Sequence, residues 1–211
     1  MKRIILVRHG ESEYNAKRIV QGHIDTDLTP AGIVQARLVA EYLKENFQID
    51  KIYSSDLRRA YRTAVIISDV LELPVIKDQR IREMNFGQWE GRTYEHIFQT
   101  DYETFQKWLQ NPVACPLPSQ EEISQFKNRL ESFYQDILKE EANNILVVGH
   151  GGSIQGLLCI ACGMGMENLW ALKHSNTGIS VIEVANPTVS IKMINSTSHL
   201  DSYKQKENPI M

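Results

Sequence analysis

Residues 4–11 read IILVRHGE, and this stretch predicts both the fold of the chain and the position of its functional site. The apolar run from Ile4 to Val7 is typical of a strand buried in a parallel sheet. The run ends at once in Arg8, His9 and a glycine. Ligands of open α/β sheets bind beyond the carboxyl ends of the strands. We therefore expect Arg8 and His9 to face a ligand.

The chemistry of these two side chains suits a phosphate group. An arginine offers a planar fork of donors that matches phosphate oxygens, and a histidine can act as a nucleophile. A second stretch repeats the pattern, because residues 144–153 read NILVVGHGGS and place His150 after another apolar run. Two strands that each end in a histidine beside glycine predict a single shared site.

The composition limits the class of protein. The chain has 211 residues without repeats or linkers, so we expect one domain over residues 1–211. Its net charge of −3 gives no basis for binding nucleic acid. No apolar stretch is long enough for a membrane span, and the start lacks a signal-peptide pattern. Three cysteines do not form a disulfide framework, so a cytoplasmic protein is expected.

Strand and helix signals alternate along the chain, which predicts a three-layer α/β/α sandwich around a mainly parallel sheet. Residues about 88–118, rich in aromatics and broken by prolines, are expected to form a helical lid inserted into this fold. The polar tail from Ser196 is expected either to be mobile or to fold over a site. The remaining expected elements are a helix opened by Thr29-Pro30, a strand at 50–55, a helix capped by Ser55 or Asp56, an extended piece at 74–77, a helix capped by Ser119 with Glu122 and ending near Glu141, a helix at 152–162, and strands at 179–184 and 189–194.

Two further features point to phosphate chemistry. Arg58 and Arg59 stand in the first turn of a predicted helix, where positive charge opposes the helix dipole unless an anion binds there. Glu83 precedes a glycine-punctuated, apolar turn. A carboxyl group close to apolar side chains and a bound anion favours its protonated form, which suits a general acid.

Other catalytic patterns are weaker. Residues 25–29 read DTDLT and match the motif of aspartate-nucleophile phosphatases, but no hydrophobic strand precedes them and Thr29 is better explained as a helix cap. The CxxC of residues 159–162 lies inside an apolar helix, which favours core packing over redox or metal chemistry. No cysteine is followed by an arginine six positions later, which excludes cysteine-nucleophile phosphatases.

The chain as a whole resembles the histidine phosphatase superfamily, which includes cofactor-dependent phosphoglycerate mutases and related phosphatases. The resemblance follows the chain in order. It is carried by the motifs LVRHGES (6–12), Asn15, QG (21–22), LT (28–29), Gly32, QA (35–36), YSSDLRRA (53–60), Glu83, FG (86–87), WEG (89–91) and VVGHGG (147–152).

The resemblance implies a role for each matching residue. His9 would be the phosphorylated nucleophile, and Arg8, Arg59 and His150 would hold the phosphoryl group. Glu83 would donate a proton to the leaving oxygen and then act as the base for water. Within the arginine pair the family pattern favours Arg59. Asn15, Gln21 and Gly22 fall where the family contacts phosphate or substrate, and Arg58 and Gly151 are further expected substrate contacts.

The resemblance also suggests a reaction. The short segment between Gly91 and Pro118 is similar to that of the phosphatase branch, whereas the mutases are longer there. Residues 85–91 and the late His199-Leu200 are similar to α-ribazole phosphatases of cobalamin synthesis and to metal-independent phosphoserine phosphatases, so both substrates stay open, with a mutase as the further alternative. One departure is that many relatives carry GGES where this chain reads PSQEE (118–122).

The expected ligand is a small phosphorylated metabolite. We expect no metal, no cofactor, and no nucleic-acid or membrane partner, and the protein is expected to be a monomer or a homodimer.

Overall fold

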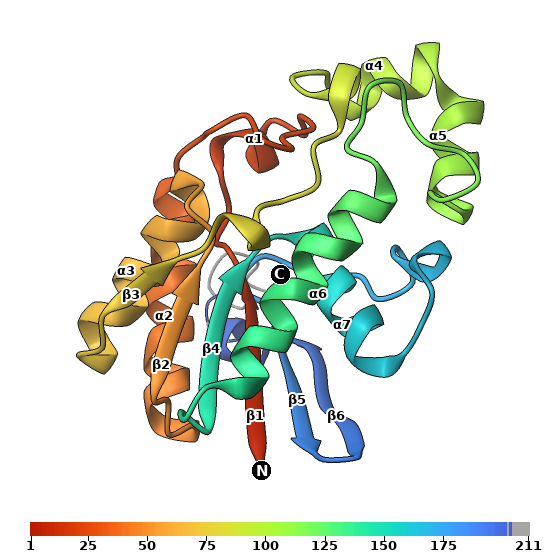
Figure 1. The fold of residues 1–211 in the computed structure, drawn as a ribbon. Coiled ribbons are helices and arrows are strands. Elements are labelled where there is room, and N and C mark those ends of the chain that lie inside the picture. Colours follow the sequence, from red (N-terminus) through yellow and green to blue (C-terminus); the bar gives the residue numbers. More distant parts are fainter. Residues whose placement is uncertain (202, 204–211) are drawn as a thin grey trace.

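A computed structural model of the chain describes residues 1–201 and residue 203, and residues 202 and 204–211 of the tail lie outside the described part. Its centre is a six-stranded sheet with the order β3-β2-β4-β1-β5-β6 (Figure 1). The first four strands in this order are mutually parallel, whereas β5 and β6 are antiparallel to their neighbours. The strands are β1 (Lys2–Arg8), β2 (Lys51–Ser54), β3 (Val75–Lys77), β4 (Asn144–Gly149), β5 (Ile179–Ala185) and β6 (Thr188–Ser196).

Helices cover both faces of the sheet, which confirms the three-layer α/β/α prediction (Figure 1). The helix pair α2 and α3 covers one face, and α6 and α7 cover the other. The α-helices are α1 (Glu13–Ala16), α2 (Pro30–Asn46), α3 (Arg58–Leu71), α4 (Tyr94–Thr100), α5 (Tyr102–Gln110), α6 (Ile123–Lys139) and α7 (Gly151–Cys162), and the 3-10 helices are η1 (Gln79–Ile81), η2 (Gly87–Trp89), η3 (Met166–Asn168) and η4 (Ser198–Leu200).

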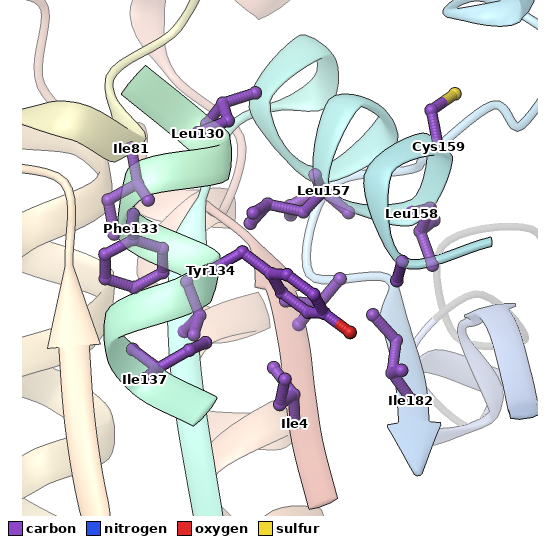
Figure 2. Packing of buried hydrophobic residues seen from close by; sticks show 14 of the residues in the cluster. Ile4, Ile81, Leu130, Phe133, Tyr134, Ile137, Leu157, Leu158, Cys159 and Ile182 are labelled. Atoms are coloured by element: carbon purple, nitrogen blue, oxygen red, sulfur yellow. The ribbon is translucent and has the colours of Figure 1, made fainter. Parts of the chain in front are cut away.

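The apolar run of β1 feeds both layers because successive side chains of a strand point to opposite faces. Ile4 and Leu6 pack in the cluster under α6 and α7, and Ile5 and Val7 pack under α2 and α3. Figure 2 shows part of the first cluster, in which Tyr134 of α6 lies beside Ile4 of β1, and Leu157 and Leu158 belong to α7. A strand buried on both faces can be continuously apolar, which explains the run that ends in Arg8.

The lid expected at about 88–118 is present as η2, α4 and α5, which lie beyond the carboxyl ends of β1 and β4 (Figure 1). It has a small core of its own, in which Trp89, Ile97 and Trp108 pack with Val20 and Leu117. Val20 comes from the loop after β1, so the lid is fastened to the segment that follows His9. The backbone N–H of Gly91 donates to the Val20 carbonyl over 2.9 Å and strengthens this attachment.

The predicted start of α6 is wrong. The helix begins at Ile123, Glu122 is its N-cap without a side-chain hydrogen bond, and Ser119 adopts a φ of 60°. Glu121 instead pairs with Arg129 (2.6 Å) and donates its N–H to the Asn85 carbonyl, which holds residues 117–121 against the turn before the lid. Tertiary contacts have therefore replaced the capping box.

The predicted cap of α3 is also wrong, because neither Ser55 nor Asp56 caps this helix. Leu57 is its N-cap, and Asp56 pairs with Arg82 at the far side of the turn. The first free N–H, that of Arg58, is accepted by the carboxylate of Asp25 over 2.7 Å. Asp25, a residue of a distant loop, therefore accepts an N–H that the side chain of an N-cap residue would usually accept.

The two motifs that had suggested other chemistry, DTDLT (25–29) and CxxC (159–162), have the structural roles that the sequence predicted. The Thr29 hydroxyl accepts the Gly32 N–H at the start of α2, so the DTDLT stretch ends in a helix cap, with Pro30 in the first turn. Cys159 is buried in the core, Cys162 at the end of the same helix is exposed, and both are free thiols. No helix in the described part of the chain is long and apolar enough to span a membrane.

Candidate active site

The two histidines of the strand ends lie side by side. β1 and β4 are adjacent and parallel, and Arg8 is in register with Gly149. The residues that follow, His9 and His150, therefore leave the sheet together. Their ring centroids are 5.2 Å apart in an edge-to-face arrangement, and both side chains are buried.

His9 is held in one orientation and kept neutral. Its Nδ1 lies 2.7 Å from the Gly10 carbonyl oxygen, which can only accept, so Nδ1 carries the proton of the neutral ring and Nε2 keeps its lone pair. Burial lowers the pKa of His9 well below its usual value of 6.5, and the charges of Arg59 and Arg8 lower it further. A neutral imidazole with a free nitrogen is the form needed for nucleophilic attack.

His150 has the same electrostatic character. Burial lowers its pKa well below 6.5, with the charge of Arg59 as the next cause. Its Nε2 lies 2.8 Å from the Ser55 hydroxyl, whereas its buried Nδ1 has no hydrogen-bond partner in the described part of the chain. His150 also forms the N-cap of α7, whose positive dipole end faces the site.

Two arginines supply fixed positive charge. Arg59 is fully buried and donates to the carbonyl oxygens of Gly22 (2.8 Å) and Ile24 (3.0 Å). Arg8 donates to the His174 carbonyl oxygen over 2.5 Å. Burial lowers the pKa of Arg59 to about 10, so it stays charged at neutral pH. The Nε atoms of both guanidinium groups are buried without a protein partner among the described residues, which leaves donors for a bound anion.

Gly22 is required by the loop that holds Arg59. Its φ is 52°, a conformation that glycine adopts without strain. A Cβ there would meet the Glu90 carboxylate at 1.9 Å. That carboxylate is already used by two backbone donors, the N–H groups of His23 and Phe86. Glu90 thus joins the loop after His9 to the turn after Glu83.

The amides of Asn15 and Gln21 are oriented by their oxygen atoms. Asn15 Oδ1 lies 3.2 Å from the backbone N–H of Ser12, and Gln21 Oε1 accepts from the Thr26 hydroxyl over 2.8 Å. The Ser12 hydroxyl lies 2.8 Å from the same Gln21 oxygen. With both oxygens engaged, each amide turns its NH₂ group away from these partners. Both residues line the cavity beside His9, where an NH₂ donor suits a phosphoryl oxygen.

Glu83 lines the same cavity. Its carboxylate accepts the N–H groups of Met84 (2.9 Å) and Gly152 (3.0 Å). The close approach explains Gly152, because a Cβ there would lie 2.4 Å from a Glu83 oxygen. The Glu83 carbonyl accepts from His23 and Arg129, so both the backbone and the side chain of this residue are fixed.

A cavity of about 340 Å³ opens at this place. Eight of the ten predicted site residues line it: Arg8, His9, Asn15, Gln21, Gly22, Arg59, Glu83 and Gly151. His150 is packed behind His9 and is not part of the lining. Arg58 points away, is exposed, and lies 3.9 Å from the Asp25 carboxylate, so the structure does not bring it to the cavity.

The remaining residues around the cavity form its other half, and the sequence did not predict them. Aromatic rings of the lid and of the loop after η3 line it, together with Gln155, Lys173 and His174; the rings are those of Phe86, Tyr94, Phe105, Trp108 and Trp170. The aromatic content of the lid segment was the available signal for the first four. Residues 170–174 carry no recognisable motif.

The family relationship follows from comparison with known sequences. The sequence profile of the histidine phosphatase superfamily (branch 1) matches residues 4–197. A Hydrogenobacter thermophilus protein named "Putative phosphoserine phosphatase 2" is 44% identical over 200 residues, covering 94% of this chain and 98% of that protein. The adenosylcobalamin/alpha-ribazole phosphatase of Escherichia coli K12 is 30% identical over 195 residues, covering 92% and 96%.

Solved structures agree with this relationship. Phosphoserine phosphatase of Entamoeba histolytica, in complex with 3-phosphoglyceric acid, has a TM-score of 0.81 at 33% identity and covers 95% of this chain and all of that one. A mycobacterial glucosyl-3-phosphoglycerate phosphatase in complex with VO₃ has a TM-score of 0.87 at 28% identity, covering 93% of this chain and 100% of that one.

Proposed function

Because the chain belongs to the histidine phosphatase superfamily and is a phosphatase of that family, we propose that it hydrolyses phosphomonoesters through a phosphohistidine on His9, without a metal ion. The observation that carries this proposal is the state of His9. The imidazole is neutral, its Nδ1 is fixed on the Gly10 carbonyl, and the positive charges of Arg59 and Arg8 act on it. A buried neutral nucleophile within a cationic pocket is suited to attack an anionic ester.

In the first step, the lone pair of His9 Nε2 attacks phosphorus and the bond to the leaving alcohol oxygen breaks. Glu83 donates a proton to that oxygen, and the alcohol departs. In the second step Glu83 takes a proton from water, whose oxygen attacks phosphorus and releases His9 and inorganic phosphate. Each step places Glu83 at the oxygen that gains or loses the proton.

The cationic groups stabilise the charge that the phosphoryl group carries in both steps. Arg8 and Arg59 offer their unused guanidinium donors, and Asn15 and Gln21 offer NH₂ groups. Donors fixed before the reaction stabilise a transition state without reorganisation at the moment of transfer. These side chains fill the role that metal ions fill in many other phosphoryl-transfer sites.

The half of the cavity that receives the alcohol is largely aromatic. Trp108 and Trp170 have ring centroids 4.6 Å apart, and Phe86 packs on both at 5.7 and 6.3 Å. Apolar rings stabilise a planar apolar group by burial and stacking. This lining supports an ester whose alcohol carries such a group, and α-ribazole 5′-phosphate, a nucleotide of cobalamin synthesis, is our first candidate.

Phosphoserine is the second candidate, supported by the names of relatives that are 44% and 33% identical to this chain. A direct comparison separates the two. The specificity constants kcat/KM for α-ribazole 5′-phosphate, phosphoserine and 3-phosphoglycerate would be measured with excess chelator. We expect undiminished hydrolysis in chelator and the highest constant for the ribazole ester.

Three outcomes would change the proposal. Complete loss of activity in chelator, restored by added metal, would contradict the metal-independent mechanism. Preference for phosphoserine would replace the first substrate by the second. Conversion of 3- to 2-phosphoglycerate faster than hydrolysis, stimulated by bisphosphoglycerate, would instead indicate a mutase.

A further inference from the structure

The loop that enters β5 contacts the backbone of the nucleophile from outside the cavity. The backbone N–H of Thr177 lies 3.0 Å from the Arg8 carbonyl oxygen and 3.3 Å from that of His9. The Asn176 side chain donates from Nδ2 to the same His9 carbonyl over 3.0 Å. Residues 176 and 177 therefore fix the end of β1 at the point where the nucleophile leaves the sheet.

Asn176 Nδ2 has a second acceptor, which lies in the phosphate pocket. It is 3.1 Å from Asn15 Oδ1, the oxygen that also faces the Ser12 N–H. A single NH₂ group thus joins the nucleophile's backbone to the amide of Asn15. Because Asn176 donates to the oxygen of Asn15, it favours the amide orientation in which the Asn15 NH₂ faces the cavity.

We propose that Asn176 is a positioning residue for phosphoryl transfer, which acts through Asn15 and through the His9 backbone without touching the substrate. Asn176 does not line the cavity, so its influence on the reaction passes through these two neighbours. The proposal rests on the phosphohistidine mechanism proposed above. It adds a residue that none of the sequence motifs included.

The conformation of the loop supports this role. Thr177 has a φ of 54°, which is strained for a β-branched residue and persists only where the surroundings hold it. Its hydroxyl donates to the Asn176 carbonyl over 2.8 Å and lies 3.0 Å from His199 Nε2. Since that hydroxyl hydrogen is already used, His199 Nε2–H is the donor to Thr177. The η4 segment thereby holds Thr177, the residue after Asn176.

The test uses Asn176→Leu, which removes both hydrogen bonds at nearly the same volume, together with Asn15→Ala and the double variant. We expect Asn176→Leu to lower kcat/KM by roughly 10- to 100-fold, below the loss for a direct phosphate donor. The loss should be similar for p-nitrophenyl phosphate and an alkyl phosphate, because it arises at the phosphoryl group. Inhibition by vanadate should weaken in parallel. Ser175→Ala, an exposed neighbour in the same loop, is the control.

The double variant distinguishes positioning from a general structural role. If Asn176 acts through Asn15, the loss caused by Asn176→Leu should shrink at least several-fold in the Asn15→Ala background. Additive losses, or an unchanged vanadate affinity, would overturn the proposal. If Asn176→Leu does not fold, Asn176→Asp serves the same cycle because its carboxylate cannot donate to either acceptor.

Phosphoenzyme bursts separate this proposal from the proposed function. A wild-type enzyme that forms no phosphohistidine would refute the mechanism itself. If the wild type shows a burst and the Asn176→Leu variant shows a burst of smaller amplitude at the normal rate, the variant has only lost folded protein. That result would refute the positioning role and leave the mechanism intact. We expect the opposite, a full amplitude formed more slowly.

Discussion

The two halves of the active-site cavity are built in different ways. The phosphate half comes from the ends of β1 and β4 and from the first turns of α3 and α7, and its side chains are held by hydrogen bonds to backbone carbonyls. The alcohol half comes mainly from the lid, where rings pack on rings and few polar contacts fix them. The difference separates the reaction, which needs fixed charges, from substrate choice, which needs a shape that can vary.

The largest expected effect at the boundary of the two halves is that of Glu83→Gln. This change should slow hydrolysis of an alkyl phosphate by roughly 10²–10⁴-fold, the usual contribution of a positioned acid. The loss should be smaller for p-nitrophenyl phosphate, whose leaving group needs little protonation. Single-turnover rates on both esters measure the difference. Equal losses would mean that Glu83 orients the site rather than donating a proton.

Substitutions in the arginine pair show whether only the arginine that lines the phosphate half contributes to kcat/KM. Arg59→Lys removes the fork that spans the Gly22 and Ile24 carbonyls and should lower kcat/KM by roughly 10²–10³-fold. Arg58→Lys is the matched change one residue earlier, where the side chain is exposed beside Asp25, and should cost less than about threefold. Steady-state kinetics of the two variants provide the comparison. Comparable losses would place Arg58 in the binding machinery after all.

The alcohol half should control selectivity between substrates rather than the rate of phosphoryl transfer. Phe86→Leu removes a ring that packs on Trp108 and Trp170, and should lower kcat/KM for an aromatic ester such as α-ribazole 5′-phosphate by roughly 10-fold, on the order of 1.5 kcal/mol of apolar contact. A small alkyl phosphate should be affected much less. Phe98→Leu is the control, because Phe98 is an exposed lid ring outside the cavity. Equal losses of kcat/KM on both esters would show that the alcohol half does not distinguish between substrates.

Acid should act on the buried histidines of the site, which are His9 and His150 in the phosphate half and His174 in the other half of the cavity. Burial lowers the pKa of His174 to about 4, and those of His9 and His150 also lie well below 6.5. Below pH 6.5 the unfolded chain therefore binds more protons than the folded one, so the free energy of unfolding should fall as the pH decreases, with no such loss above 6.5.

Each of these histidines contributes about 1.4 kcal/mol per pH unit within its window. His174→Gln retains a donor toward Ser180 and removes one titrating ring, so the dependence between pH 6.5 and 4 should become shallower by about one proton. Denaturant unfolding at several pH values measures the slope, with the exposed His96→Gln as the control. An unchanged slope would show that His174 does not stay neutral in the folded protein.

The phosphate half was predictable because its signals are local. The apolar runs before His9 and His150, and the Thr29-Pro30 start of α2, each depend on a few consecutive residues. The starts of α3 and α6 were not predictable from local sequence. At the start of α3, the Arg58 N–H is accepted by Asp25, which is 33 residues away in the chain. At the start of α6, the ion pair between Glu121 and Arg129 replaces the predicted capping box. The preference for Arg59 within the arginine pair came from the family pattern and not from local sequence, and Arg58, also expected to contact substrate, lies outside the cavity beside Asp25.

The rest of the site depends on contacts between distant segments. Lys173, His174 and Asn176 stand in a loop with no motif, and only the sheet order brings that loop beside β1. The lid was recognised from its aromatic residues, but which rings face the cavity follows from the packing of α4 and α5 on the loop after His9. Chemistry is thus encoded in short stretches, whereas specificity is encoded in the tertiary arrangement.

The most direct test of the central claim is to trap the phosphorylated enzyme during turnover and to identify the labelled residue. A rapidly quenched reaction with a ³²P-labelled ester should yield an acid-labile, base-stable phosphoenzyme, and peptide mapping should place the label on His9. Its formation should match the burst rate of alcohol release, and His9→Ala should abolish both labelling and turnover. A folded His9→Ala enzyme that still turns over, or a label on another residue, would contradict the account.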